Sequence, residues 1–268
     1  MHVIRKTVYS IKKFTEMINE GKVEVSISES VGTISFFHPK SNSLPGKILR
    51  EIASQIQKLS ADKSVKVILL KSEGEKAFCA GASFDELLQI KDFETGKKFF
   101  TGFALVINAI RKSEKFVVVR VHGKTVGGGV GLAAAGDYTL ATKESSAKLS
   151  ELALGIGPFV VGPAVERKMG KAAFCEMSID YDWRSADWAK KNGLYNQIYS
   201  GVEELDEAVN AILHKLKNGS PEAMKELKKI AWEGTEDWDT LLEARAEISG
   251  KLVLSDFTKN YINSFKKK

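Results

Sequence analysis

The chain has 268 residues, of which 43% are hydrophobic, and its formal net charge is +6 at pH 7. This length allows one large folded core, and the positive charge favours anionic partners such as nucleic acid, a membrane surface or a phosphorylated small molecule. The basic residues are spread along the chain, apart from the lysines at 266–268, so we do not expect nucleic acid as a partner. Cys79 and Cys175 are too few for a disulfide framework or a metal-ligand cluster. They fit a reducing, cytoplasmic setting.

The start of the chain indicates neither a membrane anchor nor an export signal. No apolar run reaches the roughly 18 residues that a membrane-spanning helix needs, and the first ten residues lack the apolar segment of a signal peptide. Residues 1–21 are basic and could be amphipathic, as in a transit peptide, but Glu16 and Glu20 argue against that interpretation. We therefore expect a short helical appendage at 1–21 and no membrane partner.

The predicted elements after Gly21 alternate between strands and helices. Two alternating runs, VEVSIS and VGTISFF, flank a polar turn and predict a hairpin. Continuous apolar runs of strand length are typical of a sheet that is buried on both faces, and they occur at 65–72, 116–123 and, in a shorter form, 138–142. Helical patterns are found at 45–59, 84–90 and 94–112, with a short helix before the third strand.

The chain becomes mostly helical after Gly170. The helical patterns of this part lie at 185–192, 202–217, 221–231, 238–249 and 255–265. Strands that alternate with helices, followed by a helical end, predict the α/β class. We divide the chain into the appendage at 1–21, a core at 22–200 and a helical C-terminal region at 201–268.

Three segments combine a buried strand, small residues and a following helix. They are KAFCAGASFDEL at 76–87, HGKTVGGGVGLAAAGD at 122–137 and KLSELALGIGPFVVGPAVERKMG at 148–170. Small residues at such a turn let backbone N–H groups face a ligand. A tight turn or close packing of a helix on a strand would also explain each segment alone. A functional interpretation therefore rests on the order of the three segments along the chain.

Taken in order, the three segments resemble the crotonase superfamily, the enoyl-CoA hydratase and isomerase group, and the likeness extends from about residue 23 to the end. The resemblance implies a spiral of ββα turns and C-terminal helices that help to build a homotrimer or a dimer of trimers. It also implies an acyl-CoA thioester as substrate, a place in fatty acid metabolism, no metal, and no cofactor beyond the coenzyme A of the substrate.

The resemblance assigns roles to small residues of the first two segments. Ala82 and Gly128 match the two backbone N–H groups of an oxyanion hole, which holds the thioester oxygen. Deprotonation beside a thioester forms an enolate, and each well-placed donor to its oxygen stabilises it by roughly 3 kcal/mol or more. The neighbouring positions that match substrate-binding residues of the family are Ala80, Gly81, Gly127 and Pro158.

The glycine-rich segment departs from the family pattern at Gly131. Family hydratases usually carry two glutamates that grip the added water. Glu151 matches the second, and Gly131 matches the first at the family's interval (151 − 131 = 20), so the first acid position is expected to be vacant. One carboxylate can still move a proton between two carbons of an enolate, as in the Δ3,Δ2-enoyl-CoA isomerases. We therefore expect an isomerase with Glu151 as its sole acid and base.

Several alternatives stay open. Asp85, Glu86 or Asp137 could supply a second acid and make the protein an enoyl-CoA hydratase, although Asp137 matches a position that is usually structural. The space at Gly131 could receive a substrate carboxylate, as in an enzyme similar to the methylglutaconyl-CoA hydratases. The chain could also bind acyl-CoA without catalysis. RNA binding, known for one branch of the family, finds only weak support in residues 217–232.

The first segment also lacks a lysine that often meets a CoA phosphate in the family, because Asp85 stands in its place. The phosphates would then meet Lys40, Lys76 or C-terminal lysines of a neighbouring subunit. No base flanks Cys79, so we expect it to be a small packed residue rather than a nucleophile. His122 is expected at a strand end without a catalytic role.

Overall fold

A six-stranded sheet lies at the centre of the computed structural model, which describes residues 20–265. Its order is β1 (Lys22–Ser28), β2 (Val31–Phe37), β3 (Val67–Ser72), β5 (Phe116–Val121), β7 (Tyr138–Thr142) and β10 (Gln197–Tyr199). β1 and β2 form an antiparallel hairpin, and the other neighbours are parallel. The predicted hairpin and the three predicted strands are confirmed, whereas the predicted appendage lies almost entirely outside the described residues.

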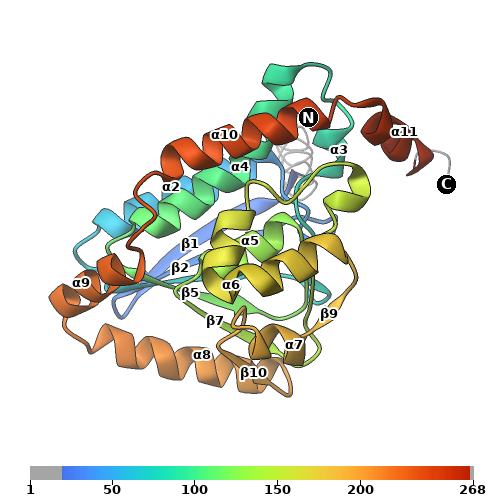
Figure 1. Ribbon diagram of the computed structural model, residues 1–268. Coiled ribbons are helices and arrows are strands. Elements are labelled where there is room, and N and C mark those ends of the chain that lie inside the picture. The colour runs from blue at the N-terminus through green and yellow to red at the C-terminus, as the bar shows by residue number, and fades with distance from the viewer. Residues whose placement is uncertain (1–19, 266–268) are drawn as a thin grey trace, which may run out of the picture.

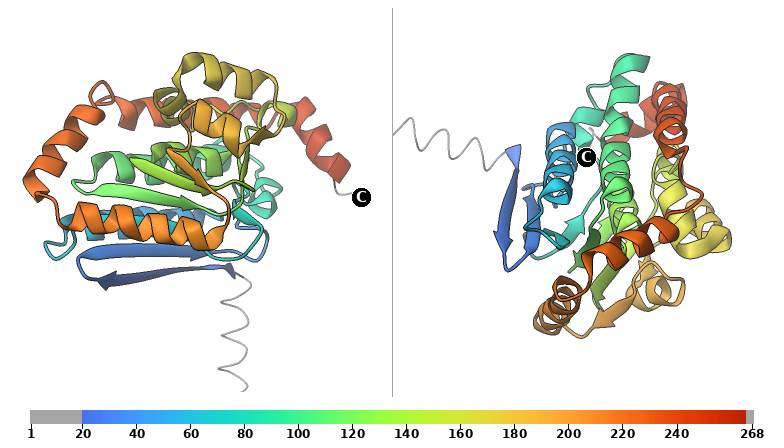
Figure 2. Two further views of the ribbon diagram at one scale, coloured as in Figure 1. Left: turned by 90° about the horizontal axis from the view of Figure 1, so that it is seen from below. Right: turned by 90° about the vertical axis from the view of Figure 1, so that its left-hand side faces the viewer.

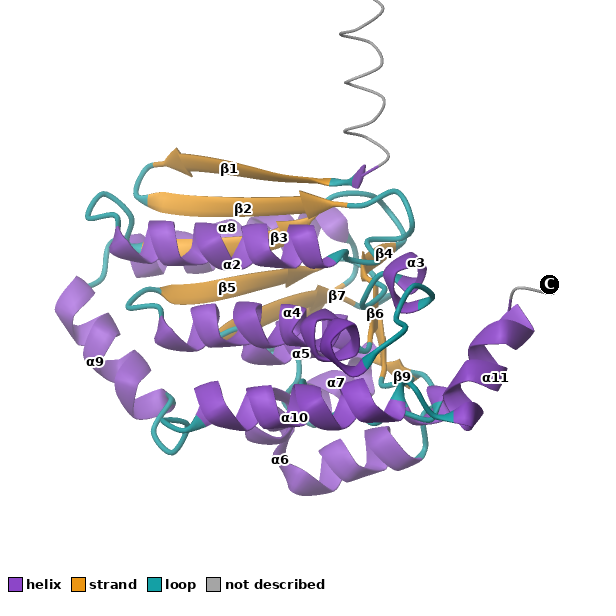
Figure 3. Cartoon of the chain, turned by 90° about the horizontal axis from the view of Figure 1, so that it is seen from above, coloured by secondary structure: helices purple, strands orange, loops and turns teal. Residues whose placement is uncertain are grey.

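Helices cover both faces of this sheet, as Figures 1 and 3 show. Helices α2 (Gly46–Ala61) and α4 (Phe93–Lys112) lie on one face, and α8 (Val202–Lys217) lies on the other. Alternate residues of β3 therefore enter two different clusters: Leu70 packs with α2 and α4, and Leu69 packs with α8. Because both faces are buried, this strand is an unbroken apolar run in the sequence.

A second, four-stranded sheet stands beside the first. It consists of β4 (Ala77–Cys79), β6 (Lys124–Val126), β8 (Ser146–Lys148) and β9 (Arg184–Ser185). The chain passes three times from a large-sheet strand to a small-sheet strand and then to helical structure, which gives repeating ββα turns. The predicted α/β class and its ββα spiral are confirmed. These strands are two or three residues long, too short for a periodic pattern to reveal them.

Short helical elements connect the two sheets, and one longer helix was missed. The short ones are α3 (Phe84–Leu87), α5 (Gly128–Ala135), η1 (Leu152–Leu154) and α7 (Ala186–Lys191). The missed helix is α6 (Gly162–Ile179), whose sequence begins with glycine and proline and contains a kink at Gly170, where φ is 80°. Proline is compatible with a first helical turn, so this loop-like composition conceals a helix start.

Of the remaining helices, α10 (Trp238–Leu252) packs closely on α4, whereas α9 (Pro221–Ala231) and α11 (Asp256–Phe265) make fewer contacts with the rest of the chain. Figure 2 shows α10 beside α4 in one layer with α2, and α11 continues past η1. Among residues 20–265, no helix is long and apolar enough to cross a membrane.

Candidate active site

A cavity of about 280 Å³ lies where the three small-residue segments meet α4 and α10. Its lining includes every residue for which sequence analysis predicted a catalytic, oxyanion or substrate-binding role: Ala80, Gly81, Ala82, Gly127, Gly128, Glu151 and Pro158. The predicted residues are therefore brought together from three separate turns of the spiral. Gly131 is the exception, since it does not line the cavity.

Two backbone N–H groups at the cavity have no protein partner within the described part of the chain. The carbonyl of Gly81 accepts a hydrogen bond from the Leu44 N–H at 2.7 Å, and the Ser83 N–H donates to the Leu44 carbonyl at 3.0 Å. The N–H of Ala82, which lies between these two residues in the chain, has no partner among the described residues. The Gly128 N–H is the first of α5 and lies 3.8 Å from the position of a Cβ on Gly81. Unpaired donors that line one cavity can bind a developing negative charge.

The start of α5 can only be built from glycine. Gly127 has φ +52° and ψ −115°, and a Cβ there would lie 2.8 Å from the Glu151 Oε1 atom. A Cβ on Gly128 would lie 2.2 Å from the ring of Phe103. Because Gly127 has no side chain, there is room for the Glu151 carboxylate, and because Gly128 has none, there is room for the Phe103 ring.

The Glu151 carboxylate is poised for proton transfer near neutral pH. Its Oε2 atom is buried and has no hydrogen-bond partner among the described residues. Burial raises the pKa of Glu151 from 4.5 to about 7. A group with a pKa near the ambient pH can both take and return a proton, because both protonation states are populated. A buried carboxylate of this kind can therefore act chemically as a general acid and base.

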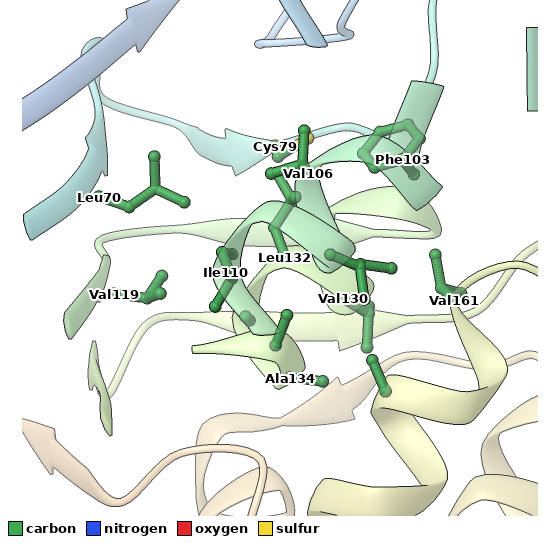
Figure 4. Packing of buried hydrophobic residues seen from close by; sticks show 14 of the residues in the cluster. Leu70, Cys79, Phe103, Val106, Ile110, Val119, Val130, Leu132, Ala134 and Val161 are labelled. Carbon is green, nitrogen blue, oxygen red and sulfur yellow. The ribbon is translucent and has the colours of Figure 1, made fainter. Parts of the chain in front are cut away.

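The acid position expected to be vacant at Gly131 is filled. A Cβ on Gly131 would lie 2.5 Å from the Val161 Cγ1 atom, so the position faces Val161. Figure 4 shows Val161 next to Val130 of α5. Val161 also lines the cavity, whereas Gly131 does not. Position 131 thus carries no acid, and the residue before α6 packs its side chain onto the glycine.

None of the alternative acids lines the cavity. Asp85 pairs with Lys40 at 2.5 Å on the surface, and Glu86 accepts from the Gly46 amide at the start of α2 at 2.8 Å. Asp137 accepts from the Lys228 ammonium and the Trp232 indole, each at 2.8 Å, and holds α9 on the core. Asp137 therefore has the structural environment that was expected of it.

The aromatic wall of the cavity was missed by sequence analysis. The large apolar side chains that line it are Phe84, Leu87, Phe99, Phe100, Phe103, Val126, Leu154, Ile156, Phe159, Val160 and Val161. Three of the phenylalanines belong to α4, and Ser249 reaches the cavity from α10. The cluster of phenylalanines between positions 99 and 103 was a usable signal. No lysine, arginine or histidine side chain is among the lining residues.

The remaining candidate residues lie away from the cavity. Cys79 is fully buried, and burial raises the pKa of its thiol to about 12, so it is a packed residue rather than a nucleophile. His122 is buried too, and burial lowers its pKa to about 4. Lys76 is exposed on the surface, and Lys40 pairs with Asp85. Residues 20–265 contain no cluster of potential metal ligands.

Comparisons with known proteins agree with this geometry. Residues 26–268 match the profile of the Enoyl-CoA hydratase/isomerase family. A short-chain-enoyl-CoA hydratase of Clostridium acetobutylicum is 28% identical over 92% of each chain. The human mitochondrial 3-hydroxyisobutyryl-CoA hydrolase is 34% identical over 52% of this chain and 38% of its own.

A solved structure shows the same fold. The enoyl-CoA hydratase from Bacillus halodurans superimposes with a TM-score of 0.84 over 90% of this chain and 99% of its own. The two sequences are 20% identical, so this likeness concerns the fold. It confirms the crotonase-like spiral and its helical C-terminal part.

Proposed function

The chain belongs to the enoyl-CoA hydratase/isomerase family of the crotonase superfamily, and on that premise we propose that it moves the double bond of a 3-enoyl-CoA to the 2,3 position. One observation carries the proposal: within residues 20–265, Glu151 is the only ionisable side chain that lines the cavity. An isomerisation needs one group that takes and returns a proton. A hydration needs a water molecule to be held and activated as well.

The proposed reaction has two proton transfers and no net loss of atoms. The Glu151 carboxylate takes a proton from C2, and the electron pair of that C–H bond moves into the thioester to form a dienolate. The N–H groups of Ala82 and Gly128 donate to the dienolate oxygen. Glu151 then returns its proton to C4 while the double bond forms between C2 and C3. The substrate supplies the coenzyme A, and the reaction uses no further cofactor.

Enoyl-CoA hydration is the second candidate, because the relative from Clostridium acetobutylicum carries that name. Here the place that the family resemblance gives to a second acid is occupied by the Val161 side chain. Asp85 and Glu86 are engaged elsewhere. These contacts support isomerisation over hydration.

A carboxylated substrate is also disfavoured. No cationic side chain lines the cavity, and the carboxylate of Glu151 is already there. A second carboxylate would be desolvated beside a like charge, which is costly unless a cation pairs with it.

A turnover panel tests the proposal. 3-Enoyl-CoA, 2-enoyl-CoA, carboxylated enoyl-CoA and saturated acyl-CoA are each incubated with the protein in deuterated water, and the products are identified by mass spectrometry and NMR. We expect fast formation of 2-enoyl-CoA from 3-enoyl-CoA, and slow hydration. Rapid hydration of 2-enoyl-CoA that disappears in Asp85→Asn or Glu86→Gln would contradict the single-acid mechanism. An absence of any exchange at C2 would favour a non-catalytic binder.

We also propose that the protein assembles as a homotrimer or a dimer of trimers. Among residues 20–264, four large apolar side chains are more than half exposed in the single chain, namely Ile179, Leu227, Ile230 and Phe257. They lie on α6, α9 and α11, and exposed apolar surface of this kind is typical of subunit contacts. Light scattering at micromolar concentration tests the assembly, and a monomer would contradict it.

A further inference from the structure

The cavity has a wall that takes no part in the proposed proton transfer. Helix α4 contributes Phe99, Phe100 and Phe103 to it, and α10 contributes Ser249. Ser249 is 1% exposed, and its hydroxyl donates to the Arg245 carbonyl of the same helix at 3.3 Å. Its one polar group is thus satisfied within α10, so Ser249 acts on a ligand mainly through its small size.

This wall is held in place by close contact between the two helices. A Cβ on Gly96 of α4 would lie 3.0 Å from the Gly250 carbonyl oxygen, and a Cβ on Gly250 would lie 2.7 Å from the Lys97 nitrogen. Lys97 also pairs with Glu243 and Glu247 of α10, at 2.8 and 2.9 Å. The backbones of α4 and α10 are therefore in close contact at these two glycines, and the ion pairs of Lys97 oppose separation of the helices.

The aromatic side chains are fixed as well. The rings of Phe99 and Phe100 meet edge to face, with centroids 5.0 Å apart. Phe103 packs over Gly128, at the start of α5. The wall is consequently apolar and uncharged, and Ser249 is the small side chain that α10 contributes to it.

From this arrangement we propose that Ser249 sets the longest acyl chain that the cavity accepts, and that the acyl group is an uncharged hydrocarbon chain which packs along Phe99, Phe100 and Phe103. The inference builds on the proposed function and names the substrate class of the same site. It assigns a selective role to a C-terminal helix that contributes no group to the proposed proton transfers. A larger side chain at position 249 would shorten the available space without touching Glu151.

The test compares affinity along a chain-length series. Saturated acyl-CoAs from four to twelve carbons are titrated into the full-length protein by calorimetry, so that the readout does not depend on turnover. Affinity should rise about fourfold for each added methylene until the cavity is full, and then level off. In Ser249→Phe the rise should stop at a shorter chain than in the unmodified protein. Ser249→Val, which adds less volume, should give an intermediate limit and covers the case in which the phenylalanine disrupts folding.

A matched control is available on the same helix. Ala244 is exposed on α10 and does not line the cavity, so Ala244→Phe should leave the chain-length limit unchanged. Identical limits in the unmodified protein and in a folded Ser249→Val variant would overturn the proposal. Tighter binding of a carboxylated acyl-CoA than of an uncharged one of equal length would overturn it too. A shifted limit without any isomerisation of 3-enoyl-CoA would sustain this inference and contradict only the proposed reaction.

Discussion

The two sides of the cavity are built in opposite ways. The side at the start of α5 consists of backbone and one acid, and it depends on the absence of side chains at Gly127 and Gly128. The side formed by α4 and α10 consists of large side chains, and it joins segments far apart in the chain, as the Lys97–Glu247 pair shows. Short contiguous segments therefore supply the reactive groups of this site, whereas helices that lie far apart in the sequence pack together to form the space for the acyl chain.

The largest expected effect comes from removing the single acid. Glu151→Gln keeps the shape of the side chain but cannot transfer the proton, so turnover of 3-enoyl-CoA should fall about 10²–10⁴-fold. The affinity for saturated acyl-CoA should remain, because the opposite wall is unchanged. Kinetics and calorimetry on the same preparation check both statements. The control is Glu166→Gln, an exposed glutamate on α6 that should leave both values as they are.

The pH dependence of turnover isolates the same carboxylate without a mutation. Burial raises the pKa of Glu151 to about 7, and the proposed base is the ionised form. The rate should therefore increase with pH up to about 7 and level off above it. Below that pH it should fall about tenfold per unit, since the ionised fraction does so. A pH–rate profile that stays flat down to pH 5 would show that Glu151 is not the titrating base.

The glycine at position 127 offers a way to disturb the backbone side alone. In Gly127→Ala the new Cβ would meet the Glu151 carboxylate, in a backbone conformation that alanine adopts at a cost of about 1–3 kcal/mol. If the whole cost is borne by the transition state, it corresponds to a rate loss of about 5- to 150-fold.

Two measurements separate this effect from general damage. The apparent pKa of the pH–rate profile should shift in Gly127→Ala, because the carboxylate is displaced. Gly201→Ala is the control, since nothing lies within 4 Å of a Cβ at that position. An unchanged pH–rate profile in Gly127→Ala would mean that the glycine does not position Glu151.

The smallest effect is expected where the glycine-rich helix meets α6. Gly131→Ala places a methyl group against Val161 and should cost about 1–3 kcal/mol through overpacking. The melting temperature should drop by several degrees, at about 2–4 °C per kcal/mol for a chain of this size. In a Val161→Ala background the same substitution should cost less, because the facing side chain is shortened. If the melting shifts of Gly131→Ala and Val161→Ala simply add in the double mutant, the two residues do not compete for space.

Much of the chemical side could be predicted from the sequence. The glycine-rich segment, Ala82 and Glu151 lie in segments whose strand, turn and helix follow one another directly. The hairpin and buried strands were also predicted, because their patterns reflect local geometry and burial. The contact of Val161 with Gly131 was not predictable, since it depends on how the missed helix α6 lies on α5. Ser249 gave no signal either, because its place at the cavity follows from the packing of α10 on α4.

The buried carboxylate of Glu151 also makes stability and activity follow pH in opposite directions. Its folded-state pKa is about 7, above its ordinary value of 4.5, so the fold favours the neutral form. Below pH 4.5 the group is protonated in both the folded and the unfolded chain, and no penalty arises. As the pH rises towards 7, ionisation favours unfolding by an amount on the order of 3 kcal/mol, which is fully developed above pH 7. The pH range in which the base is active is therefore the range in which this residue destabilises the protein most, so Glu151→Gln is expected to melt at a higher temperature than the unmodified protein at pH 8.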